Sequence, residues 1–146
     1  MVEGRRVRTL AGVDADLQEL FDAALAGQGH AHAPYSRFPV GAALRAASGR
    51  VYAGCNVENA SFPEGTCAEA AAIAAMVAAG DREIVAVLTV AGGDDLATCC
   101  GGCRQRIREF ATAATRIHAA GPDGVRATFT MDELLPLSFG PSNLAD

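Results

Sequence analysis

The sequence has 146 residues, of which half are hydrophobic and a fifth are charged, and its net charge is −5 with no lysine. This composition indicates a globular domain and argues against a nucleic-acid surface, which needs concentrated positive charge to displace counterions. No stretch has the form of a secretory signal or of the ~20 apolar residues of a membrane span, and five cysteines, an odd number, favour reduced thiols over a disulfide framework.

The first half of the chain predicts a helix followed by a β-hairpin. Apolar residues recur at helical spacing from Leu17 to Leu25, after Asp14 as a plausible cap and before Gly27. Residues 38–44 and 50–56, joined through Ser48-Gly49, read as two strands of a hairpin. A polar, turn-rich loop over residues 57–66 then leads to Cys67.

The second half alternates helices and strands. Residues 68–79 form a helix whose only charge is Glu69, so we expect a sheet on one side of it and another subunit on the other. Residues 84–90 read as a strand covered on both faces, and a helix runs through Phe110. Strands follow at 115–119 and 127–130, and Thr130 with Glu133 has the form of a capping box.

This order of elements predicts an α/β fold in which helices flank a mixed sheet, as one domain spanning residues 1–146. The acidic, lysine-free surface and the reduced thiols together favour a cytoplasmic protein that binds a small molecule, such as a free nucleoside.

Three cysteines and one glutamate carry the chemistry. Cys67, Cys100 and Cys103 fall at the starts of two helices, where N–H groups and the helix dipole favour thiolates. Three protein ligands with an open fourth position are typical of catalytic zinc, and Glu69 is placed to move protons beside it. The alternative is a structural four-cysteine site that includes Cys55 or Cys99.

Several motifs, in this order along the chain, resemble the cytidine deaminases, small zinc enzymes that convert cytidine and deoxycytidine to uridine and deoxyuridine. They are residues 34–43 (PYSRFPVGAA), 54–61 (GCNVENAS), 67–69 (CAE), 100–105 (CGGCRQ), and 134–136 (LLP) with 138–141 (SFGP). The resemblance implies a three-layer α-β-α fold with about five strands, one Zn²⁺ per subunit, a homotetramer, and a role in pyrimidine salvage. It also implies that water activated by zinc attacks C4 of cytosine while the glutamate shuttles protons.

The resemblance assigns roles to nine residues: the ligands Cys67, Cys100 and Cys103, the proton shuttle Glu69, and the substrate-binding residues Phe38, Asn56, Glu58, Ala68 and Phe139. Among these, Asn56 and Glu58 match the pair that grips the ribose hydroxyls, although both are also suited to capping a loop. Phe38 matches the aromatic that covers the pyrimidine. Phe139 matches an aromatic lent to a neighbouring subunit, and simple packing is the alternative for both rings.

Two positions depart from the family pattern. Ala70 stands where members often carry an arginine that neutralises the zinc–thiolate charge, and we expect the helix termini, with Arg104 or Gln105, to compensate. We also expect Ala70→Arg to lower the acidic limb of the pH–rate profile. Cys99 stands where a proline is usual.

Three rival functions remain. The chain could deaminate a related aminopyrimidine nucleoside such as blasticidin S or a modified cytidine, or it could be a zinc-stapled binding module without turnover. An enzyme that edits bases in nucleic acid is disfavoured by the lack of basic surface.

Overall fold

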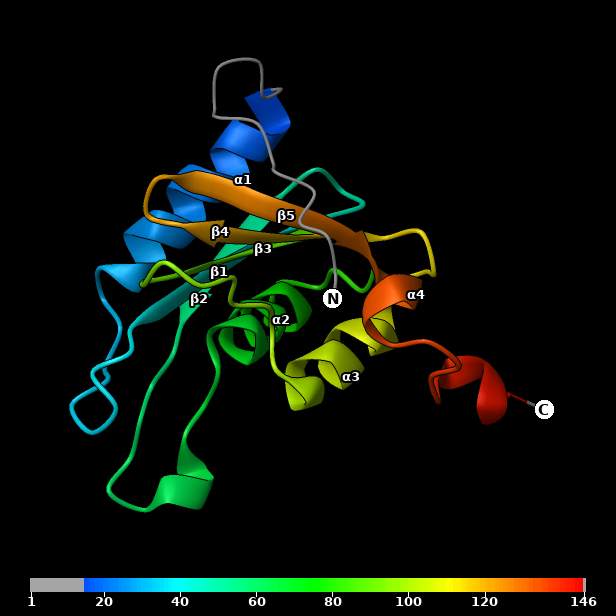
Figure 1. Ribbon diagram of the computed structural model, residues 1–146. Helices are drawn as coiled ribbons and strands as arrows, with labels where there is room; N and C mark the ends of the chain where they lie inside the picture. Colours follow the sequence, from blue (N-terminus) through cyan, green and yellow to red (C-terminus); the bar gives the residue numbers. More distant parts are fainter. Residues whose placement is uncertain (1–14, 146) are drawn as a thin grey trace.

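The structure, a computed structural model, describes residues 15–145 and is built around one mixed sheet (Figure 1). The strand order is β2-β1-β3-β4-β5, and only the β3–β4 pair is parallel. The strands are β1 (Val40–Ala46), β2 (Val51–Cys55), β3 (Ile84–Ala91), β4 (Arg116–Gly121) and β5 (Gly124–Thr130). The expected mixed sheet of about five strands is therefore confirmed, whereas the suggested cap Asp14 lies outside the described residues.

Helices cover both faces of this sheet. Helix α1 (Ala15–Gln28) lies on one face, and α2 (Ala68–Ala78), α3 (Gly101–Phe110) and the short α4 (Met131–Leu134) lie on the other (Figure 1). Each face has its own apolar cluster. The α1 cluster includes Leu20, Phe21 and Leu88, and the α2–α3 cluster includes Met76 and Ile107. The predicted order of elements and the three-layer α-β-α arrangement are both confirmed.

Strand β3 is the centre of the sheet, with β1 antiparallel on one side and β4 parallel on the other. Its residues from Val87 to Ala91 are buried, as the continuous apolar run predicts. Next to it, β1 lies so close to α1 that a Cβ at Gly41 would overlap the backbone carbonyl of Ala24. Only glycine fits at position 41, and this lets α1 pack closely against β1.

Helix α2 is covered by the sheet on one side, as expected, and the second subunit expected on its other side stays a prediction. Its sheet-facing residues are buried, including Ala72, Ile73 and Met76. Residues on its other side, such as Ala74 and Ala78, are exposed in the single chain. An apolar face of α2 therefore remains exposed next to α3 and is available for contact with another subunit.

The starts of α2 and α3 carry the three cysteines of the predicted zinc site. Cys67 is the N-cap of α2 and Cys100 is the N-cap of α3, both with extended backbone angles. The last predicted signal is also present, because Thr130 and Glu133 form a reciprocal capping box at α4. No helix in the described part of the chain has the length and apolar character to cross a membrane.

Candidate functional site

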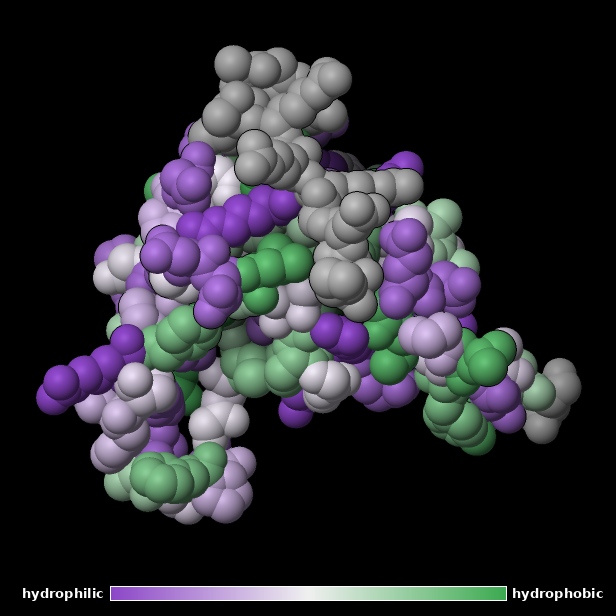
Figure 2. Space-filling view, viewed as in Figure 1, coloured by the Kyte–Doolittle hydropathy of each residue, from purple (hydrophilic) through white to green (hydrophobic). Residues whose placement is uncertain are grey.

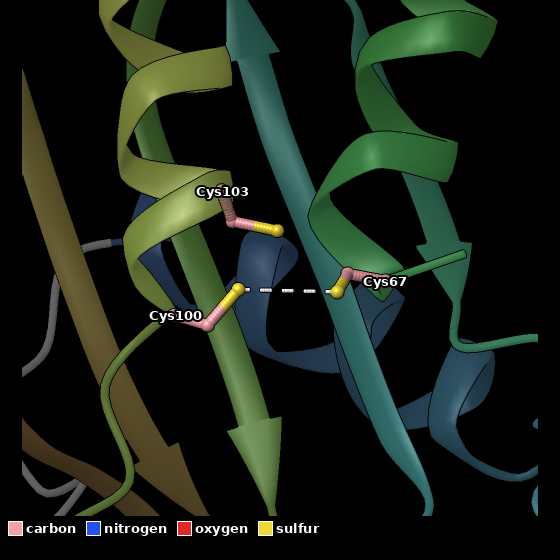
Figure 3. A group of neighbouring side chains, drawn as sticks. All are labelled: Cys67, Cys100 and Cys103. Carbon is pink, nitrogen blue, oxygen red and sulfur yellow. Dashed lines mark hydrogen bonds between the residues drawn. The ribbon is translucent and has the colours of Figure 1, made fainter. Parts of the chain in front are cut away.

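Three cysteine sulfurs converge between the N-termini of α2 and α3 (Figure 3). The Sγ atoms of Cys67, Cys100 and Cys103 all lie within 4.8 Å of one another, and those of Cys67 and Cys100 are 4.0 Å apart. Two thiolates bound to one tetrahedral zinc ion lie about 3.8 Å apart, given a Zn–S bond of about 2.3 Å. The arrangement therefore fits three ligands of a single zinc ion.

The surroundings of the three thiols differ. Burial raises the pKa of Cys67 and the pKa of Cys103, which is fully buried, whereas the backbone N–H of Cys103 donates to Cys100 and lowers the pKa of that thiol. Two of the three sulfurs thus resist ionisation unless a cation is close. A divalent metal ion supplies that charge, and thiolate ligands select a soft or borderline metal such as zinc.

Neither remaining cysteine joins the cluster. Within residues 15–145, no fourth histidine, cysteine, aspartate or glutamate ligand atom belongs to the group formed by the three sulfurs. Cys99 is buried in the α2–α3 cluster, and burial raises its pKa to about 11, which suits a neutral packing residue. The geometry gives the four-cysteine structural site, with Cys55 or Cys99 as fourth ligand, no support.

Glu69 lies two residues after Cys67, in the first turn of α2, and is 4% exposed. Its Oε1 accepts a hydrogen bond of 2.9 Å from the hydroxyl of Thr89 on β3. Sequence reasoning missed Thr89, although it is the only polar residue of the apolar run over 84–90. The bond fixes one carboxylate oxygen and leaves the other for chemistry in the cavity.

A cavity of about 330 Å³ opens beside this glutamate. Pockets for small ligands usually begin at about 300 Å³. Its wall contains seven of the nine predicted site residues: Phe38, Asn56, Glu58, Cys67, Ala68, Glu69 and Cys100. Cys103 is not part of this wall, but its Sγ lies within 4.8 Å of those of Cys67 and Cys100, which are. A second hollow of about 490 Å³ adjoins the first through shared residues and is bordered by the edge-to-face rings of Tyr35 and Phe62.

Asn56 and Glu58 both hold the segment that precedes β1. Asn56 accepts from the N–H of Val40 at 2.8 Å and donates to the carbonyl of Phe38 at 2.9 Å. Glu58 accepts from the N–H groups of Tyr35 and Ser36. The loop-capping role considered for the pair is therefore real, and both side chains also line the cavity. A carboxylate has four lone-pair positions, so Glu58 keeps acceptor capacity for a ligand.

The hydrogen bonds to Glu58 act on its ionisation. The side-chain hydrogen bond with Ser36 is the largest cause that lowers the pKa of Glu58 from its ordinary value of 4.5, and the backbone N–H bonds add to it. The carboxylate form is thus favoured at the mouth of the cavity.

Arg104 and Gln105, the two candidates for neutralising the charge of the sulfurs, make their hydrogen bonds elsewhere. Arg104 donates to the carbonyls of Cys99 and Leu134 and to the Thr98 hydroxyl. Gln105 donates to the carbonyl of Phe139. The expectation that one of them compensates for Ala70 is therefore wrong. Arg106, which the sequence reasoning passed over, reaches the sulfur of Cys103, with Nη1 at 4.0 Å.

The two predicted aromatic residues are placed differently. Phe38 is 46% exposed and lines the cavity, whereas Phe139 is 59% exposed and does not line the cavity beside Glu69. The ring of Phe139 is therefore not part of the site of its own chain.

Comparisons with known proteins agree with this geometry. The family described as the cytidine and deoxycytidylate deaminase zinc-binding region matches residues 14–119. The chain is 37% identical to a cytidine deaminase of Halalkalibacterium halodurans, over 90% of this chain and 99% of that protein. It is 35% identical to one of Sporosarcina psychrophila, over 89% and 96%. A cytidine deaminase crystal structure from Burkholderia pseudomallei, 37% identical, superposes with a TM-score of 0.79 over 84% of this chain and 98% of that one.

Proposed function

Since the chain belongs to the family of zinc-binding cytidine and deoxycytidylate deaminases, we propose that it hydrolyses cytidine and deoxycytidine to uridine and deoxyuridine. The observation that carries the proposal is the convergence of three sulfurs within 4.8 Å beside a buried glutamate, at the wall of one cavity. Cys67, Cys100 and Cys103 would hold the zinc ion. Zinc, when bound, lowers the pKa of a water molecule and so provides a nucleophile near neutral pH.

Glu69 moves the protons in this proposal. Thr89 holds its Oε1, so its Oε2 takes the proton of the attacking water and returns it to the amino nitrogen that leaves C4 of the ring. Water is consumed and ammonia is released. Because Glu69 is 4% exposed, bulk water does not compete for its carboxylate.

The rest of the cavity would hold the nucleoside. Asn56 and Glu58 bind the ribose hydroxyls with the capacity that their loop contacts leave, Phe38 covers the pyrimidine, and a backbone group of Ala68 contacts the base. The preserved pair at 56 and 58 favours an ordinary ribose over the substrate of a blasticidin-type deaminase.

A test of the function compares the wild-type protein with Glu69→Gln. Loss of cytidine absorbance measures turnover, and metal analysis measures zinc. We expect turnover to fall by about 10²–10⁴-fold while zinc stays bound, because the variant loses a general acid–base and no ligand. Wild-type protein that binds zinc without turnover on cytidine or a panel of its analogues would contradict the proposal and favour a binding module.

The active form in this proposal is a homotetramer. Apolar side chains are exposed on the open side of α2 and on two projecting segments, residues 57–66 and the C-terminal residues 137–144 (Figures 1 and 2). The exposed ring of Phe139 supports its role as an aromatic lent to a neighbouring site. Large exposed apolar surfaces mark protein interfaces.

Light scattering tests the assembly with two matched substitutions. Ala74→Glu places a charge on the open face of α2, and we expect it to produce smaller species with less activity. Ala26→Glu makes the same change at an exposed position on α1, across the sheet, and should leave the tetramer intact. A tetramer that survives Ala74→Glu would contradict this interface.

The cellular setting is part of the proposal. All five cysteines are free, which supports a reducing, cytoplasmic compartment, and the reaction suits pyrimidine salvage. We infer that the whole chain acts as a single domain, since the site draws on residues from 38 to 103 around one sheet.

A further inference from the structure

The metal centre carries an electrostatic imbalance. Three thiolates and one Zn²⁺ sum to a charge of −1, and Cys103 has no exposed surface. A charge that is removed from water is costly unless another charge or hydrogen-bond donors compensate it. The helix N-termini of α2 and α3 provide part of this compensation as dipoles. A full positive charge close to a sulfur would provide more.

Arg106 provides such a charge. Its Nη1 lies 4.0 Å from Cys103 Sγ, the distance of a long N–H···S contact. Residues three apart share one face of a helix, so Arg106 stacks directly over Cys103 on α3. The neighbouring arginines of the helix are engaged elsewhere: Arg104 with Thr98 and two carbonyls, and Arg108 with Ser138 and the carbonyl of Ala111.

Small residues leave room for this guanidinium. Ala70 and Ala74 line the same groove between α2 and α3 as Arg106 does. In the first turn of α3, a Cβ at Gly102 would lie 3.1 Å from Nη1 of Arg106, whereas a Cβ at Gly101 would have nothing within 4 Å. The guanidinium therefore occupies a space that alanine at 70 and glycine at 102 keep open.

We propose that Arg106 is a positioning residue of the metal centre, which donates to the Cys103 sulfur from α3 and supplies the positive charge that Ala70 does not supply from α2. The inference rests on the proposed zinc deaminase function. Arg106 contacts the sulfur of Cys103 and not the reacting atoms of the substrate. Losing this contact should therefore first weaken the binding of zinc by the three cysteines. Substitution of groups that hydrogen-bond metal ligands typically weakens metal binding by about 10- to 100-fold.

Zinc affinity, measured by competition with a chromophoric chelator, tests the proposal. Arg106→Gln removes the charge and shortens the side chain while keeping it polar, and we expect zinc to bind about tenfold more weakly. Arg116→Gln makes the same charge change at an exposed position at the start of β4, away from the cysteines, and should leave zinc affinity unchanged. Arg106→Lys should retain most of the affinity.

Moving the arginine to α2 tests whether weaker zinc binding is due to the lost charge or to a change in the fold. In the double variant Ala70→Arg, Arg106→Gln, a cation returns to the same groove from the opposite helix, and we expect affinity to recover. Gly102→Ala should weaken zinc binding in the direction of Arg106→Gln, whereas Gly101→Ala should not. These paired responses distinguish a contact with the Cys103 sulfur from a general loss of stability. Far-UV circular dichroism and thermal melting measure the stability of each variant in parallel.

Two results would overturn the inference. One is an Arg106→Gln variant that stays folded and binds zinc as tightly as the wild type. The other is weaker zinc binding that the double variant fails to restore, since Arg106 would then act only through the fold. Failure of the proposed function looks different: the wild type would bind zinc but not deaminate cytidine, whatever the affinity ratio between the variants.

Discussion

Thr89→Val tests whether the hydroxyl on β3 positions the carboxylate of Glu69, the proposed proton shuttle. Valine has nearly the shape of threonine but cannot donate, so Glu69 Oε1 loses its 2.9 Å hydrogen bond while the cavity wall keeps its form. Hydrogen bonds to charged groups contribute about 1.5–3 kcal/mol, and each 1.4 kcal/mol corresponds to about a factor of ten. If this whole contribution acts in the transition state and not in the enzyme–substrate complex, kcat falls by about 10- to 150-fold.

The assay is the loss of cytidine absorbance at saturating substrate, together with metal analysis. We expect KM and zinc content to change little, because the Thr89 hydroxyl donates to Glu69, which is neither a proposed zinc ligand nor one of the proposed ribose-binding residues. Thr89→Ser restores the hydroxyl and should recover most of the activity. If Thr89→Val keeps wild-type kcat, the hydrogen bond does not position Glu69. If Thr89→Ser loses as much as Thr89→Val, the methyl group rather than the hydroxyl matters.

Three further predictions concern stability. The pKa of Glu58 is lowered in the folded state, chiefly by Ser36, so its carboxylate stabilises the fold above its unfolded pKa of 4.5, and this contribution disappears as the pH falls through the lower folded value. In Glu58→Gln, melting temperatures should therefore depend less on pH between 4.5 and that lower value. Gly41→Ala forces β1 away from the carbonyl of Ala24 and should cost about 1–3 kcal/mol in urea unfolding, and an unchanged midpoint would contradict the close approach. Thr130→Ala removes an N-cap and should cost about 1 kcal/mol, measured in the same way.

Much of the fold follows from local patterns. The apolar run over 84–90 predicts a central strand because only a strand covered on both faces tolerates so little polarity, and β3 occupies that place. The cysteines at 67 and 100 precede apolar or glycine-containing helix starts, and both are N-caps. Since the chain enters both helices beside the same part of the sheet, the convergence of the sulfurs was predictable from the order of elements and the resemblance together.

The partners of the key groups were not predictable in the same way. Thr89 and Glu69 are twenty residues apart and meet only because the fold brings the first turn of α2, a helix that packs mainly on β1 and β2, next to β3. The choice among the α3 arginines depends on the helical phase: positions one and two after Cys103 turn away from it by about 100° each, whereas the third returns to its face. Closeness in sequence favoured Arg104 and Gln105, and geometry favours Arg106.

Because Cys103 is buried in the core, the stability of the fold should depend on the concentration of free zinc. This sulfur belongs both to the proposed zinc site and to the apolar cluster that joins α2 and α3 to the sheet. A zinc ion held there would bridge the starts of α2 and α3, and it would stabilise only the folded chain. At a free zinc concentration of about 1,000 times the dissociation constant, this linkage is worth about 4 kcal/mol. Zinc depletion would therefore threaten the persistence of the protein as well as its chemistry, and a cell short of zinc would lose the enzyme by unfolding.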